Sequence, residues 1–156
     1  MIKFTIETLF KDTILKMYSD LRIFNTVTKL DQHNCVDTRI IKFGMGRQTG
    51  HTQTAADLCN HFVKQGFNVI LVSDSKQRLT ETIRGNSLLH ALHNMNSIVG
   101  YNLNAGTGAM SLARHTTNKT VVICDAILPK HMDALYSELA YAHNRTPNEN
   151  YYFILQ

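Results

Sequence analysis

The sequence has few cysteines, no long apolar run and no signal-peptide pattern, and each absence excludes a class of protein. Its three cysteines, Cys35, Cys59 and Cys124, are odd in number and widely spaced. This excludes a disulfide framework and paired metal-ligand spacing. No apolar stretch reaches the roughly 18 residues of a membrane-spanning helix. The first residues lack the apolar stretch and the cleavage site of a signal peptide. We therefore expect a cytoplasmic protein, or one of the host cytoplasm if viral, with no membrane association.

Recognisable nucleic-acid motifs, repeats and linkers are also missing. The six tyrosines and seven phenylalanines do not alternate with basic residues as in RNA-binding or single-strand-binding motifs. There is no internal repeat, no low-complexity tract and no stretch that would separate domains. A length of 156 residues corresponds to about one domain. We expect a single domain over residues 1–156, with residues 1–38 as an N-terminal helical extension.

The positive charge of the chain is concentrated in its middle third. The formal net charge is +4. Basic and acidic residues balance in 1–38 and in 97–156, whereas residues 39–96 carry seven basic and three acidic side chains. Such an excess favours anionic ligands. Nucleic acid is therefore a candidate partner through basic residues 39–84, although a solvated basic surface explains the same pattern equally well.

Apolar periodicity predicts an α/β fold. Spacings of three and four residues predict an amphipathic helix over residues 6–24. After it, short apolar runs alternate with helical patterns, which is typical of parallel crossover units. The expected strands are 40–43, 68–73, 97–101, 120–124 and 151–155, and the expected helices are 51–65, 77–94, 108–115 and 130–143. Together they predict a three-layer αβα sandwich with a mostly parallel sheet of about five strands. Gly66 is expected to end the helix over 51–65, and Pro129 is expected to start the helix over 130–143.

A glycine-rich segment follows the first expected strand and precedes a helix. It contains Gly44, Gly46 and Gly50 and ends in Gly50-His51-Thr52. Glycines let backbone N–H groups surround phosphate oxygens, and the following helix adds the positive end of its dipole. In such a loop the hydroxyl of Thr52 would hold Mg²⁺. The layout predicts a phosphate-binding loop for ATP or another nucleoside triphosphate.

The segment departs from the phosphate-binding pattern twice. Met45 occupies the first glycine position, and His51 occupies the place of the lysine that neutralises the β- and γ-phosphates. Histidine is shorter than lysine and mostly neutral at pH 7. Arg47 and Lys76 are candidates to supply the missing charge. The alternative is a glycine-rich turn that binds no ligand.

A second acidic site ends the fourth expected strand. Residues 120–124 are followed by Asp125, so its carboxylate should lie at the carboxyl edge of the sheet, where open α/β sheets bind ligands. A carboxylate at that place can hold Mg²⁺. A glutamate that orients the attacking water commonly follows such an aspartate, but here the next residue is Ala126. The alternative role of Asp125 is to cap the next turn.

In this order of elements the chain resembles the ATPase core of the P-loop NTPases, closest to phage terminase large subunits and the first motor domain of helicases. In those proteins the loop often reads Gly-Arg-Gln-Thr-Gly-Lys-Thr. Six of these seven positions match here, namely Gly46, Arg47, Gln48, Thr49, Gly50 and Thr52, and the seventh is His51 in place of the lysine. Other segments are also similar to elements of the family. The strand and loop after the first motif helix correspond to residues 68–75, the magnesium-binding strand to 121–125, and the sensor strand to 151–156. The resemblance covers residues 39–156.

The resemblance implies roles for individual residues. The loop residues 46–52 would contact the nucleotide, with Gly50, His51 and Thr52 at its phosphates, and Gln156 would be the polar end of the sensor strand. Asp125 would be the catalytic carboxylate and, with Thr52, would hold the metal. The chain stops at the sensor strand, so we expect neither a second motor domain nor a nuclease domain.

Three functions remain open from the sequence. The leading one is a phage-like P-loop NTPase homologue with an eroded active site, a degenerate Walker A loop and little hydrolysis, acting as a nucleotide-binding, nucleic-acid-associated or assembly component. The second is a working ATPase in which other residues replace the missing lysine and glutamate. The third is a protein-interaction module that binds no nucleotide, such as an inhibitor of a host factor; a protein partner is expected in any case.

The motif order also predicts the arrangement of the sheet. We expect strand 40–43 in the centre, flanked by strands 121–124 and 151–155 and parallel to both, because ligand-binding edges form where neighbouring crossovers diverge.

Overall fold

The fold is described from a computed structural model, which covers residues 2–30, 35–44, 51–103, 111–145 and 149–156. In this part of the chain the strands are β1 (Ile40–Phe43), β2 (Asn68–Ser73), β3 (Ile98–Asn102), β4 (Thr120–Asp125) and β5 (Tyr151–Leu155). The α-helices are α1 (Ile2–Val27), α2 (His51–Lys64), α3 (Lys76–Gly85), α4 (Ser87–Asn94) and α5 (Met132–Arg145). Short 3₁₀ helices are η2 (Val36–Arg39), η3 (Ser111–His115) and η4 (Pro129–His131).

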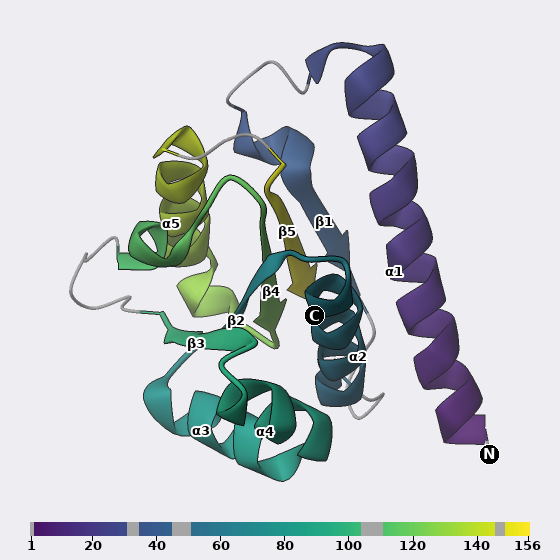
Figure 1. The fold of residues 1–156 in the computed structure, drawn as a ribbon. Helices are drawn as coiled ribbons and strands as arrows, with labels where there is room; N and C mark the ends of the chain where they lie inside the picture. Colours follow the sequence, from purple (N-terminus) through teal and green to yellow (C-terminus); the bar gives the residue numbers. More distant parts are fainter. Residues whose placement is uncertain (1, 31–34, 45–50, 104–110, 146–148) are drawn as a thin grey trace.

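All five strands are parallel and form one sheet in the order β1-β5-β4-β2-β3. The register aligns Phe43 with Leu155, and Leu155 with Asp125. The carboxyl ends of β1, β5 and β4 therefore meet at one edge, which is the lower side of the sheet in Figure 1. The α/β class and the parallel five-stranded sheet expected from the sequence are confirmed.

The expected central position of strand 40–43 is wrong. Among the described strands β1 lies at an edge and pairs with β5 alone, which separates it from β4. The burial of the strands gives the physical reason. Every residue of β5 is buried, whereas β1 is short and exposes Lys42. A wholly apolar strand belongs inside a sheet covered on both faces, and a short strand with a lysine suits an edge.

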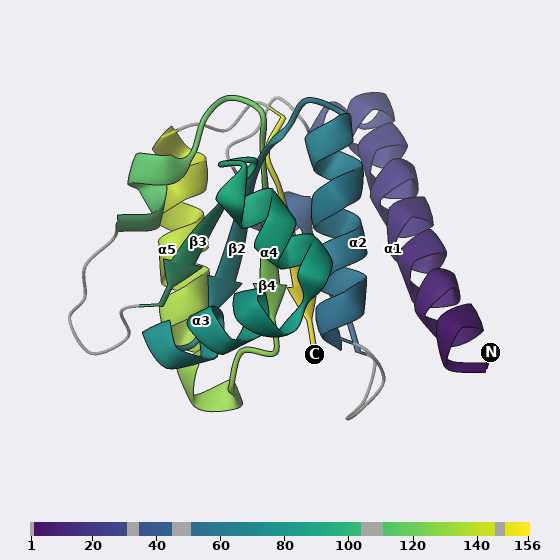
Figure 2. The same ribbon diagram turned by 60° about the horizontal axis from the view of Figure 1, so that its bottom comes forward.

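Helices cover both faces of the sheet, as expected for three layers (Figure 1 and Figure 2). One face packs its apolar side chains, among them Leu71, Ile123 and Phe153, against α1, α2 and the α3–α4 pair. The other face, with Ile70 and Tyr152, packs against α5 and η3. Alternate residues of each strand thus enter two separate apolar clusters, as the pleat of a strand requires.

The N-terminal helix belongs to the first of these clusters. Tyr18 is buried and makes edge-to-face contacts with the rings of Phe62 in α2 and Tyr151 in β5, with centroids 5.1 Å apart in each case. Asn25 donates a hydrogen bond to the backbone oxygen of Thr38 at 2.9 Å. Residues 1–38, expected as an extension, therefore contribute α1 directly to the core.

Helix ends follow local sequence signals, with one break that periodicity did not reveal. Gly66 has φ +84°, and the bonds from Gly66 N to Val63 O and from Phe67 N to Phe62 O close α2 as a Schellman motif. The helix predicted over 77–94 is divided in two at Asn86. The Asn86 side chain accepts hydrogen bonds from the N–H groups of Leu88 and Leu89 and starts α4.

Two features noted in the sequence, the cysteines and the apolar runs, can be located in the structure. Cys59 and Cys124 are fully buried core residues, and burial raises the pKa of both thiols. Among the helices described, none combines the length and the apolarity needed to cross a membrane.

Candidate functional site

A cleft of about 640 Å³ opens at the carboxyl edge of the sheet. It lies where β2, β4 and β5 end and where α2 begins, the place at which open parallel sheets bind ligands. The residues that line it are His51, Thr52, Ser73, Arg78, Thr82, Asp125, Ala126, Ile127, Leu128, Pro129 and Gln156. Four residues that the sequence singled out, His51, Thr52, Asp125 and Gln156, therefore share one cleft. Gly46, Arg47, Gln48, Thr49 and Gly50 lie outside the described residues.

Thr52 and Asp125 are in direct contact. Thr52 is the second residue of α2, and its Oγ1 donates a hydrogen bond to Oδ2 of Asp125, the last residue of β4, at 3.4 Å. The two residues are 73 positions apart in the sequence. The fold thus brings together the hydroxyl and the carboxylate that the sequence analysis assigned to a metal.

The carboxylate of Asp125 is poorly compensated. Asp125 is 5% exposed, and its Oδ1 has no hydrogen-bond partner among the described residues. Burial raises the pKa of Asp125. His51, the hydrogen bond from Thr52 and Arg78 act in the opposite direction, while the nearby Asp74 raises the pKa further. A buried carboxylate with an unused oxygen is a suitable ligand for a cation.

Two backbone hydrogen bonds hold residues that line the cleft, Gln156 and Ala126. The N–H of Gln156 donates to the carbonyl oxygen of Phe43 at 2.9 Å, which ties the end of β5 to the end of β1. The N–H of Ala126 donates to Leu155 O at 3.1 Å, and Ala126 has the left-handed φ of +53°. Any residue with a Cβ is strained in this conformation. A glutamate at this position would bear the same strain.

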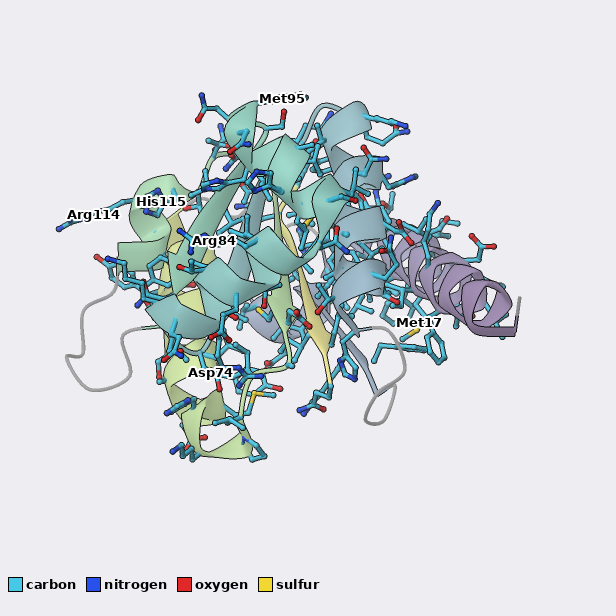
Figure 3. All side chains as sticks on the ribbon, turned by 90° about the horizontal axis from the view of Figure 1, so that it is seen from below. Met17, Asp74, Arg84, Met95, Arg114 and His115 are labelled. Carbon is cyan, nitrogen blue, oxygen red and sulfur yellow. The ribbon has the colours of Figure 1, made fainter. Side chains whose placement is uncertain are left out.

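An acidic group that the sequence analysis did not assign adjoins Asp125. Asp74 directly follows β2 and is buried. Its Oδ2 accepts hydrogen bonds from Arg78 Nη1 at 3.1 Å and from the N–H of Leu128 at 2.9 Å, and it lies 3.5 Å from His131 Nδ1. Figure 3, seen from the lower side of Figure 1, labels Asp74 at this edge. Its position after a buried strand is the signal that identified Asp125, so the same rule could have found it.

In the described part of the chain, two basic side chains line the cleft, Arg78 and His51. Arg78 lies in the first turn of α3 and is partly exposed, so its guanidinium can reach both Asp74 and the cleft. Lys76, which the sequence analysis considered for this role, is exposed and does not line the cleft. Arg47, the other candidate, lies outside the described residues.

Not all of the basic residues described in 39–84 lie near the cleft. Lys76 and Arg78 begin α3 near the cleft, whereas Lys64 is the last residue of α2. A helix of 14 residues is about 20 Å long, so Lys64 lies about that far from the cleft end of α2. Lys64 therefore does not share a patch with Lys76 and Arg78.

The donors at the cleft suit Mg²⁺ better than a transition metal. Magnesium is typically held by one or two protein oxygen ligands together with substrate phosphates and water, whereas a structural zinc site needs four protein ligands. The cleft offers the Asp125 carboxylate and the Thr52 hydroxyl. Within the described ranges there is no group of three or more His, Cys, Asp or Glu side chains that could hold a metal on its own.

Comparison of the chain with models of protein families gave no match. Comparison with curated proteins gave no match either.

Proposed function

We propose that the protein binds a nucleoside triphosphate with Mg²⁺ in this cleft, as a P-loop NTPase-like domain that hydrolyses the nucleotide slowly or not at all. The observation that carries the proposal is the contact between Thr52 and Asp125, at the start of α2 and the end of β4. It supplies a hydroxyl and an under-paired carboxylate at the place where the glycine-rich segment joins its helix.

Each described residue has a defined task in this proposal. The first N–H groups of α2 and the dipole of the helix attract the phosphates. Thr52 and Asp125 hold Mg²⁺, which when bound supplies positive charge that neutralises phosphate oxygens. His51 lines the same cleft, but its side chain is shorter than that of the lysine it replaces. Ala126 provides no group that could position water. Binding without efficient turnover is what this set of residues supports.

Arg78 is the residue that we propose as the cation of the site. Its guanidinium donates a hydrogen bond to Asp74, and its positive charge lowers the pKa of Asp125. Guanidinium groups bind phosphate through two parallel hydrogen bonds, so Arg78 can take part of the role of the absent lysine. The position of Arg78 supports an eroded site with a replacement cation over a turn that binds no ligand.

We expect Arg78→Gln to weaken triphosphate binding by about five- to tenfold, because a charge-assisted hydrogen bond in a partly exposed site contributes about 1–1.5 kcal/mol. Equilibrium titration with ATP and Mg²⁺ measures the change. Arg84→Gln is the matched control, since Arg84 lies exposed near the end of the same helix and outside the cleft (Figure 3). Equal losses in the two variants would show that only the general positive charge of α3 matters.

Steady-state turnover separates the proposal from a working ATPase. Phosphoryl transfer depends on neutralisation of charge and on positioning of water, and the chain lacks both customary residues. The proposal requires turnover well below about 1 per second, the lower end of ordinary enzymatic rates. Turnover at or above this rate, lost in Asp125→Asn, would establish the ATPase instead.

A further inference from the structure

The outer side of α1 carries apolar side chains that nothing else in the described structure covers. In Figure 1 and Figure 2, α1 forms one flank of the molecule, with α2 and β1 on its inner side. Its inner side chains Ile14 and Tyr18 are buried in the core. On the opposite side Leu9 and Ile23 are each 60% exposed and Val27 is 76% exposed. An amphipathic helix of a monomeric domain normally turns polar residues to the solvent on this side.

These exposed residues belong to a regular seam. Its members follow one another at intervals of four, three, four, three and four residues, the spacing by which helices pack side by side in coiled coils. The seam consists of Leu9, Thr13, Lys16, Asp20, Ile23 and Val27. Phe24 and Met17, also exposed, border it.

The seam is symmetric about its midpoint, which lies between Lys16 and Asp20 at the level of residue 18 along the helix axis. Reversal of the helix exchanges Leu9 with Val27, Thr13 with Ile23, and Lys16 with Asp20. An antiparallel pair of identical helices would therefore place apolar residues opposite each other at both ends and a lysine opposite an aspartate twice in the middle. A parallel pair would place Lys16 against Lys16 and Asp20 against Asp20, and such like-charge contacts are unfavourable. The seam is complementary to itself in the antiparallel orientation only.

From this complementarity we propose that the outer side of α1 is a homodimer interface, in which the seam pairs antiparallel with the seam of a second copy around a two-fold axis at position 18. An interface of this kind is isologous, since the same patch is used by both subunits. Lys16 and Asp20, which are 3.3 Å apart within one helix, each gain the opposite charge of the partner copy. Charged residues in a seam fix its register and orientation.

The dimer is expected to be weak and reversible. α1 has 26 residues and is about 39 Å long, so one seam buries less than a standard protein interface. We therefore place the dissociation constant in the micromolar range. Sedimentation equilibrium of the full chain from about 5 to about 500 µM covers this range. A chain that stays monomeric over the whole series would overturn the proposal.

Charge reversal tests the predicted pairing. Lys16→Asp and Asp20→Lys each create two like-charge contacts in the homodimer, and each should raise its dissociation constant about tenfold or more. A mixture of the two variants restores both opposite pairs, so it should form the heterodimer at wild-type strength. The exposed Glu81→Lys on α3 makes the same charge change as Asp20→Lys and should leave association unaltered. Association that is insensitive to these changes, or variants that fail to complement each other, would contradict the interface.

Cross-linking tests the orientation independently. Leu9 and Val27 are 18 residues apart, about 27 Å along the helix, so only antiparallel pairing brings position 9 of one copy near position 27 of the other. In a Cys35→Ser background, which removes the exposed native thiol, Leu9→Cys mixed with Val27→Cys should form a disulfide-linked heterodimer on mild oxidation. Leu9→Cys alone should not cross-link at a comparable rate. Faster self-linking of Leu9→Cys would indicate a parallel pair and refute the proposal.

Discussion

Asp125→Asn is expected to remove Mg²⁺-dependent nucleotide binding and, at the same time, to make the ligand-free protein more stable. Asparagine keeps the size of the side chain but loses the charge that attracts the cation, so Mg²⁺ should no longer strengthen ATP binding. Stability should rise because a buried carboxylate with a bare Oδ1 is costly to fold. We expect the midpoint of thermal unfolding at pH 7 to increase by a few degrees, which corresponds to about 1 kcal/mol in a chain of this size.

The pH dependence of stability should report the same carboxylate. Burial raises the pKa of Asp125 in the folded state above its ordinary value of 3.8. The folded state therefore binds the proton more tightly than the unfolded state does, and stability from this group falls as pH rises from about 3.8 through the raised pKa. Above that window the cost is complete. The stability gain of Asp125→Asn should accordingly grow across the window and stay constant at pH values above the raised pKa.

Asp74→Asn is the matched control, because it changes a second buried aspartate that also follows a strand. Oδ1 of Asp74 has no partner among the described residues, as in Asp125, but its Oδ2 is paired with Arg78 and with the N–H of Leu128, so neutralisation of Asp74 should destabilise the fold. Opposite stability changes in the two variants would mark Asp125 as a ligand site and Asp74 as a structural group. If Asp125→Asn is also destabilising, Asp125 has the structural capping role that the sequence left open.

His51→Lys is expected to strengthen triphosphate binding by about ten- to a hundredfold. A unit charge placed about 4 Å from a phosphate in a medium of intermediate dielectric constant gains up to about 4 kcal/mol, of which desolvation and screening remove a large part. The gain should be smaller for ADP than for ATP, because the missing lysine normally neutralises the β- and γ-phosphates. Calorimetric titration of both nucleotides with the variant and the unmodified protein measures it.

His61→Lys is the control for this substitution. It makes the same change in the same helix, but His61 lies in the last turn of α2 and does not line the cleft. Similar gains in the two variants would mean that ATP responds to net charge alone. An unchanged affinity in His51→Lys would show that position 51 does not face the phosphates.

Short-range features of the fold could be read from the sequence. Continuous apolar runs located β1, β2 and β5 at their observed bounds, and Gly66 marked the end of α2 through its left-handed φ. These features depend on neighbouring residues only. The break at Asn86 was missed because the apolar periodicity continues across it and the capping hydrogen bonds are invisible to a periodicity argument.

Long-range features were harder to predict. The order of strands depends on how each crossover packs. The fully buried β5 occupies the interior position that we had expected for β1. For the site, the motif pointed to Thr52 and to Asp125, and the fold joins them. Asp74 and Arg78 were given no role from the sequence, and their position beside Asp125 follows from the pairing of β2 with β4.

Calorimetric titration of the unmodified protein with ATP, with and without Mg²⁺, tests the central claim most directly. The Thr52–Asp125 site predicts saturable one-to-one binding that Mg²⁺ strengthens at least several-fold, and this effect of Mg²⁺ should disappear in Asp125→Asn. Binding of equal strength with and without Mg²⁺ would contradict the metal site. No binding of ATP, ADP or GTP at millimolar nucleotide would contradict the nucleotide-binding function itself and leave the protein-interaction module as the better description of this fold.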